Sequence, residues 1–224
     1  MRYLEKFAPL ALCILLCACA QASNDIATSA PVNWTAERGK KVVLIDPDVE
    51  LSELTFGGVA EPRADWTQTG KNFIKADIAS TLQAKGIATA TADSVTDPHE
   101  VQLVKLHGAV GQSILQNYIL KLPTKKNNFD WTLGPGVAAL HDRYQADYAL
   151  FVYVRDSYSS DSKMAFAILT MSPTGAMQLG FASLVDLRTG RVVWFNRLAS
   201  ATGSLKTDKG AAASVDNLLH GLPL

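Results

Sequence analysis

Ala149-Leu150-Phe151-Val152-Tyr153-Val154 is the most strand-like stretch of this 224-residue chain. An unbroken apolar run that is rich in β-branched and aromatic side chains is typical of a strand buried on both faces of a sheet. We therefore expect this strand at the centre of a sheet, with the other elements arranged around it.

The part of the chain before this strand predicts two strands and three helices. Short apolar runs at 41–47, which ends at Asp46-Pro47, and at 87–92 predict strands. Helical spacing predicts a helix over 65–85, Asp97-Pro98 supplies an N-cap and a first-turn proline for the next helix, and a third is expected over 135–145. The apolar stripe expected on the second helix comprises Val101, Val104, Leu106, Val110, Ile114, Leu115 and Tyr118.

After the central strand, further strands are expected at 164–171, 177–187 and 191–197, the last with Trp194 in the core. A C-terminal helix follows, with apolar residues at i, i+3, i+4 and i+7 from Val215. The order β-α-β-α-(α)-β-β-β-β-α predicts an α/β (α+β) fold, a single mixed sheet with helices packed on it, in one domain over 41–224.

The amino terminus has the features of an export signal. A charged start precedes the apolar segment 7–20, which is shorter than the roughly 20 residues that span a bilayer. Leu16-Cys17-Ala18-Cys19 resembles the bacterial lipobox, which implies a signal peptide over 1–18 and a lipid on Cys19 that holds the chain to a membrane. Ordinary cleavage after Ala18-Cys19-Ala20 or Ala20-Gln21-Ala22 is the alternative.

Residues 19–40 read as the lipid anchor and a flexible tether, because they lack apolar periodicity. Ala20 follows the lipid-bearing position, and by resemblance to enterobacterial lipoproteins this implies the periplasmic face of the outer membrane. A soluble periplasmic protein is the alternative. Trp34 is the one aromatic residue of the tether, and it is a candidate partner contact.

Composition narrows the classes of partner. Lys and Arg number 21 and Asp and Glu number 21, 48% of residues are hydrophobic and 19% are charged, as in a globular protein. The only adjacent lysines are Lys40-Lys41 and Lys125-Lys126, so no basic stripe is available for nucleic acid. Nucleic acid is therefore not an expected partner.

Two segments carry a family resemblance: Ala146-Asp147-Tyr148-Ala149-Leu150 and the hairpin from Leu184 to Trp194, with Arg188-Thr189-Gly190 at its turn. They resemble the periplasmic α/β domain of curli-secretion lipoproteins, penicillin-binding-protein activator lipoproteins and the amino-terminal domain of the TolB translocation protein. The resemblance implies an envelope lipoprotein, but these segments are structural and bring no functional residue. No pair of long alternating segments predicts membrane-inserting strands.

Asp46 and Asp48 are the candidate ligand-binding residues. They flank Pro47 at the carboxyl end of a strand, where open α/β sheets place ligands, and two carboxylates there suit a cation or a shared proton. Gly134 to Ala139 satisfies G-x-G-x-x-A, but it does not follow the first strand, so a dinucleotide site is not expected.

The histidines form no metal-ligand pair, and no serine lies in a nucleophile elbow. His141 is expected on a solvated helix face, and a meeting of Asp46 with His141 or Asp156 across the sheet is the alternative. We expect no enzyme activity, no metal and no cofactor.

The leading hypothesis is a lipid-anchored periplasmic accessory, assembly or regulatory protein that acts by protein–protein contact, with Trp34, Tyr153 and Tyr158 as candidate contacts. One alternative is a small-ligand or cation-binding domain or hydrolase that uses Asp46 and Asp48. Another is a subunit of a secretion oligomer, and so a homo-oligomer.

Overall fold

The computed structural model of this protein describes residues 25–26, 32–33, 35–37, 39–92, 97–125, 128–198 and 202–224. The predicted signal peptide, Cys19 and Trp34 lie outside these residues, so the predictions made for them stay predictions. No helix within the described ranges is both long enough and apolar enough to cross a bilayer.

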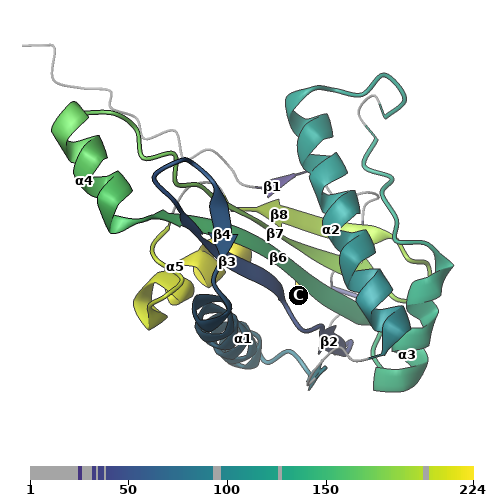
Figure 1. The fold of residues 1–224 in the computed structure, drawn as a ribbon. Helices are drawn as coiled ribbons and strands as arrows, with labels where there is room; N and C mark the ends of the chain where they lie inside the picture. Colours follow the sequence, from purple (N-terminus) through teal and green to yellow (C-terminus); the bar gives the residue numbers. More distant parts are fainter. Residues whose placement is uncertain are drawn as a thin grey trace, which may run out of the picture.

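The fold is a mixed eight-stranded sheet with helices on both faces, which confirms the predicted fold class (Figure 1). β6 (Tyr148–Ser159) is central, as predicted, and pairs in parallel with β2 and β3 and antiparallel with β7. The other strands are β1 (Asp25–Ile26), β2 (Val42–Leu44), β3 (Asp48–Leu54), β4 (Ala60–Pro62), β5 (Thr89–Thr91), β7 (Gln178–Asp186) and β8 (Val192–Arg197).

The helices form a layer on each face of the sheet. They are α1 (Ala64–Ala84), α2 (Pro98–Ile119), α3 (Ala138–Tyr144), α4 (Asp161–Thr170) and α5 (Asp208–Leu218), with a 3₁₀ turn at Pro135–Val137 before α3. α1 and α5 share one core with the sheet, and α2 and α3 share the other. α4 lies beyond the end of the sheet (Figure 1).

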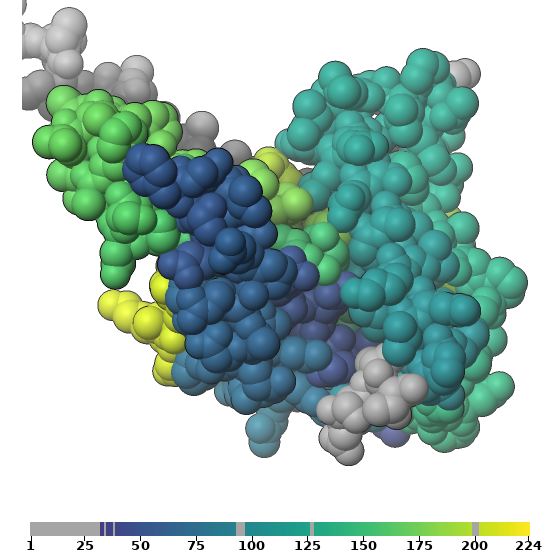
Figure 2. Space-filling model, viewed as in Figure 1, coloured from purple at the N-terminus to yellow at the C-terminus, as the bar shows by residue number. Residues whose placement is uncertain are grey.

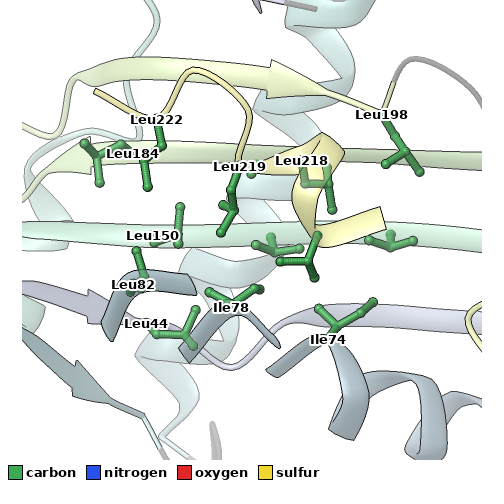
Figure 3. Packing of buried hydrophobic residues seen from close by; sticks show 14 of the residues in the cluster. Leu44, Ile74, Ile78, Leu82, Leu150, Leu184, Leu198, Leu218, Leu219 and Leu222 are labelled. Carbon is green, nitrogen blue, oxygen red and sulfur yellow. The ribbon is translucent and has the colours of Figure 1, made fainter. Parts of the chain in front are cut away.

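Alternation along β6 builds both cores at once. Leu150 and Val152 face α1 and α5, whereas Phe151 and Tyr153 face α2. In Figure 3, Ile78 of α1 lies in the first core together with Leu residues of β2, β6, β7 and α5. Burying each such side chain contributes roughly 1.5–3 kcal/mol, so the two cores provide a large favourable contribution to folding.

Local sequence signals set several boundaries as predicted. Asp97 caps α2, and its carboxylate accepts the N–H of His99 at 2.8 Å. In the β7–β8 hairpin, Asp186 Oδ1 accepts the N–H groups of Arg188 and Thr189, and Gly190 has φ 72°, which glycine adopts without strain.

The predicted strand at 164–171 is wrong, because this segment forms α4. Ser160 caps the helix by accepting the N–H of Lys163 at 3.4 Å, and Met171 ends it in the left-handed region with φ 53°. Only Ala167 of the helix is buried. The apolar run therefore lies largely on the surface instead of in the sheet, which the sequence pattern did not distinguish.

The strand predicted at 41–47 does not end at Pro47, because the chain continues along β6 as β3. Leu44 pairs with Leu150 and Asp48 with Tyr153, so this segment has one residue more than β6 between the two pairs. Pro47 has no N–H to donate to the ladder, and the extra residue makes a bulge at Asp46-Pro47. Because of the bulge, the Asp46 side chain faces α1 and the Asp48 side chain faces α2.

The stripe predicted for α2 is out of phase at several positions. Val101, Leu106 and Tyr118 are exposed, whereas the buried residues are Glu100, Leu103, His107, Gly108, Gly111 and Ile114. The glycines let α2 approach the sheet closely: a Cβ at Gly111 would lie 2.0 Å from Phe181 Cε2. Small and polar residues therefore form much of this face, which a search for large apolar residues does not detect.

Candidate functional site

A cleft opens at the Asp46-Pro47 bulge, between α1 on one face of the sheet and α2 on the other. Its volume is about 180 Å³, and its lining is Asp46, Pro47, Asp48, Val49, Lys71, Val101, Val104 and Lys105. Figure 2 shows the surface hollowed between blue α1 and teal α2. This is the carboxyl end of β2, the position at which open α/β sheets bind ligands and at which the sequence placed Asp46 and Asp48.

Asp46 faces α1. Its Oδ2 lies 2.7 Å from Lys71 Nζ, and its Oδ1 lies 3.7 Å from Lys75 Nζ. Lys75 also donates to the carbonyl of Ala92, just after β5, at 3.1 Å. The spacing of four residues puts both lysines on the same side of α1, so one helix face supplies two cations to one carboxylate.

Asp48 faces the α2 side of the sheet. Arg155 Nη2 of β6 donates to Asp48 Oδ1 at 2.8 Å, and Lys105 Nζ of α2 donates to Oδ2 at 3.2 Å. Arg155 also lies over the ring of Tyr153, 4.1 Å from its centroid. The Asp48 carboxylate is therefore held from a strand and from a helix, and its cations differ from those of Asp46.

These contacts alter the expected chemistry of the pair. Each carboxylate has two cationic partners of its own, so the two do not share a single site. Within the described ranges, no group of three Asp, Glu, His or Cys residues could hold a metal ion. Asp46 and Asp48 both line the cleft, and the side chains that pair with them are cationic.

The two residues considered as partners of Asp46 have other roles. Asp156 is buried, where it accepts the Tyr158 hydroxyl and, at 2.9 Å, Gln178 Nε2, and burial raises the pKa of its carboxyl. His141 is partly exposed, and its Nδ1 lies 2.5 Å from the Ala146 carbonyl oxygen, so the ring is held at the end of α3 and not beside Asp46.

His107 is a buried polar residue next to the cleft. Its ring stacks on Phe151 with centroids 5.0 Å apart, and its Nε2 lies 2.9 Å from Ser183 Oγ. Burial lowers the pKa of His107 to about 3, against an opposing effect of Asp48. The imidazole is therefore neutral at pH 7 and serves as a packed core group. The sequence did not indicate that His107 is buried, because this face of α2 also carries Gly108 and Gly111 and lacks a continuous apolar pattern.

The candidate contact residues Tyr153 and Tyr158 have partners within the fold. Tyr153 is buried and stacks on Phe181 at 4.7 Å, and its hydroxyl accepts Gln112 Nε2 at 3.1 Å. The Tyr158 hydroxyl accepts the N–H of Leu205 at 2.7 Å, and burial raises its pKa. Tyr153 is therefore occupied by contacts within the fold and is not exposed to a partner.

Exposed apolar side chains gather instead around α4. We define the α4 surface as Phe56, Met164, Phe166, Ile168, Leu169 and Met171, all of which are exposed. Ile168 is 73% exposed, Leu169 82% and Met171 94%. Phe56, from the β3–β4 turn, meets Phe166 edge to face at 5.2 Å, so the turn and the helix form one surface. Sequence reasoning missed it because it placed 164–171 inside the sheet.

No known protein family matches this chain, and no curated protein does. The solved structures to which it is similar at low identity include the following three. Lipoprotein GNA1162 from Neisseria meningitidis is 16% identical over 70% of this chain and 77% of that one, with a TM-score of 0.32. A PelC dodecamer from Paraburkholderia phytofirmans is 14% identical over 87% of this chain and 93% of that one, with a TM-score of 0.41. The LpoB C-terminal domain from Salmonella enterica is 14% identical over 71% of this chain and 80% of that one, with a TM-score of 0.25.

Proposed function

We propose that this chain is a lipid-anchored accessory protein of the bacterial envelope, without catalytic activity, that acts by inserting α4 into an apolar groove of another envelope protein. The exposed α4 surface is the observation that carries the proposal. Contiguous apolar surface of this kind is unusual on a monomeric soluble protein and typical of a binding site.

The spacing of the exposed residues suits a groove. Met164, Ile168 and Met171 lie at i, i+4 and i+7, the anchor pattern of a helix bound in a hydrophobic groove. Phe166 and Leu169 widen the apolar arc beyond what a flat surface covers, because successive residues are about 100° apart around a helix. A partner with an apolar groove covers such an arc.

The charge pattern favours a protein over a lipid surface. Helices that lie in a membrane interface usually carry many Lys or Arg residues on their polar face. The polar residues of α4 include one cation, Lys163, and one anion, Asp161, and no charged residue occurs from 164 to 185. Docking would therefore bury few charges, and no basic face attracts anionic lipid.

The proposed anchor fits this role. A lipid on Cys19 would hold the chain at the periplasmic face of the outer membrane. The tether is shorter than the predicted 19–40, because Asp25–Ile26 pairs with β8 and the Glu37 carboxylate accepts the Tyr148 hydroxyl. A flexible tether of about six residues, 19–24, has an end-to-end distance of roughly 13 Å. Confinement within that distance raises the local concentration of the α4 surface near membrane-bound partners.

The test is the size of the complex extracted from native envelopes in mild detergent. Ile168→Asp and Leu169→Asp should each release the chain as a monomer. Ile119→Asp is the matched control, because Ile119 at the end of α2 is also exposed, at 77%. It should leave the complex intact, and all three purified variants should melt like the parent chain, since exposed substitutions change stability by about 0.5 kcal/mol or less. An unchanged complex in the α4 variants would refute the proposal.

A further inference from the structure

The cationic side chains around the cleft outnumber the carboxylates. Asp46 and Asp48 contribute two negative charges, and Glu50, two residues further along β3, adds a third at the exposed edge. The cations that pair with the two aspartates are Lys71, Lys75, Lys105 and Arg155. Among the described residues around the cleft, four cations therefore face three carboxylates, even with Glu50 included.

Two of these lysines line the cleft from opposite helices. Lys71 projects from α1 and Lys105 from α2, and both belong to its lining. The Lys105 side chain is 67% exposed, so it has the freedom to turn from Asp48 toward a ligand. A ligand between α1 and α2 would meet an ammonium group on each side.

Apart from these two lysines and the carboxylates of Asp46 and Asp48, the lining is apolar. Pro47, Val49, Val101 and Val104 contribute hydrocarbon surface between the charged groups. The volume of about 180 Å³ is below the roughly 300–1,000 Å³ that is typical of pockets for drug-sized ligands. The cleft therefore suits a small molecule with a charged head and a short apolar part.

We propose that the cleft at the Asp46-Pro47 bulge is a binding site for a small anion, a carboxylate or a phosphate, held between Lys71 and Lys105. Asp46 and Asp48 hold the cations in place before the anion arrives, and the anion then shares them. This site is separate from the α4 surface, so a test of anion binding does not depend on the proposed partner contact.

The sign of one isosteric substitution separates this proposal from the cation site that two aspartates suggest. Asp46→Asn removes a negative charge from the cleft and releases Lys71. Anion binding should become tighter, whereas a cation site would become weaker. Asn has nearly the shape of Asp, so the fold is expected to tolerate the change.

Isothermal titration calorimetry at low ionic strength, on the full mature chain in neutral detergent, measures binding directly. The probes are inorganic phosphate and butyrate, which distinguish the two kinds of anion, and calcium chloride. Low ionic strength limits screening of the lysines. Lys105→Met removes an exposed side chain without disturbing the core, and Lys209→Met, on the exposed side of α5, is the matched control.

Saturable one-to-one binding of phosphate or butyrate is expected. Asp46→Asn should lower the dissociation constant several-fold, Lys105→Met should raise it by about tenfold, which corresponds to ~1.4 kcal/mol, and Lys209→Met should leave it unchanged. The proposal is overturned if neither anion binds saturably, if Asp46→Asn weakens anion binding, if both lysine variants behave alike, or if calcium binds in place of the anions.

Discussion

His107 makes the stability of this domain depend on pH in a way that can be measured. Its ordinary pKa is 6.5, and burial against Phe151 lowers it to about 3 in the folded chain. Below pH 6.5 the unfolded chain gains a proton that the folded chain does not, so the free energy of unfolding decreases as the pH falls toward 3.

The size of the effect follows from the two pKa values. Between about pH 7 and about pH 5, His107 alone should reduce the free energy of unfolding by about 2 kcal/mol. With an ordinary dependence on urea, this lowers the urea midpoint by about 1 M. Other groups titrate in the same range, so the contribution of His107 is the difference between the parent chain and a variant without it.

His107→Gln supplies that comparison, because glutamine can still hydrogen-bond to Ser183 but does not titrate. The variant is expected to be less stable at pH 7 and to lose less stability on acidification. Urea unfolding followed by tryptophan fluorescence across this range gives both slopes. Parallel slopes would show that His107 does not resist protonation in the folded chain, and the reasoning would fail.

Four further predictions concern packing, the anchor and catalysis. Trp194 is buried as predicted, so Trp194→Ala should lower the free energy of unfolding by about 3–5 kcal/mol, and an unchanged melting curve would contradict this. Gly111→Ala should destabilise by about 1–3 kcal/mol in urea unfolding, because its Cβ would overlap Phe181, and parent-like stability would refute that contact. Cys19→Ser should release the chain from the membrane fraction or leave it unprocessed, whereas a mature terminus at residue 21 or 23 by mass spectrometry would exclude the lipid. The purified chain should turn over no generic ester, phosphate or glycan substrate, and turnover that disappears in Asp46→Asn would identify an enzyme.

The elements that the sequence predicts well are those whose signal is local. The apolar run at Ala149 to Val154 and the cap at Asp97 depend on neighbouring residues, and both have the predicted role. β3 was missed because Glu50 and Glu53 interrupt its apolar pattern and Pro47 precedes it. Its place in the sheet depends on pairing with β6, which lies about a hundred residues further along the chain.

The cleft was predicted only in part for the same reason. Asp46 and Asp48 lie where strand position predicts a site, but the chemistry of that site depends on their partners. Lys71, Lys105 and Arg155 come from three separate elements, and only the packing of α1 and α2 on opposite faces brings them together. The sequence therefore located two carboxylates without indicating the cations that pair with them.

The α4 surface shows a different limit. An apolar run has the same hydropathy whether the folded chain buries it or leaves it exposed for a partner, so 164–171 read as a core strand. Ser160-Asp161, a cap followed by an acidic first turn, was the available signal for a helix.

Site-specific photo-crosslinking in the native cell envelope tests the proposed docking of α4, with the photoreactive residue at Leu169 and, as control, at Ile119. We expect one discrete adduct with a different envelope protein from position 169, absent from position 119 and lost when Ile168→Asp is present in the same chain. An adduct only with lipid, only with a second copy of this chain, or with no protein at all would contradict it.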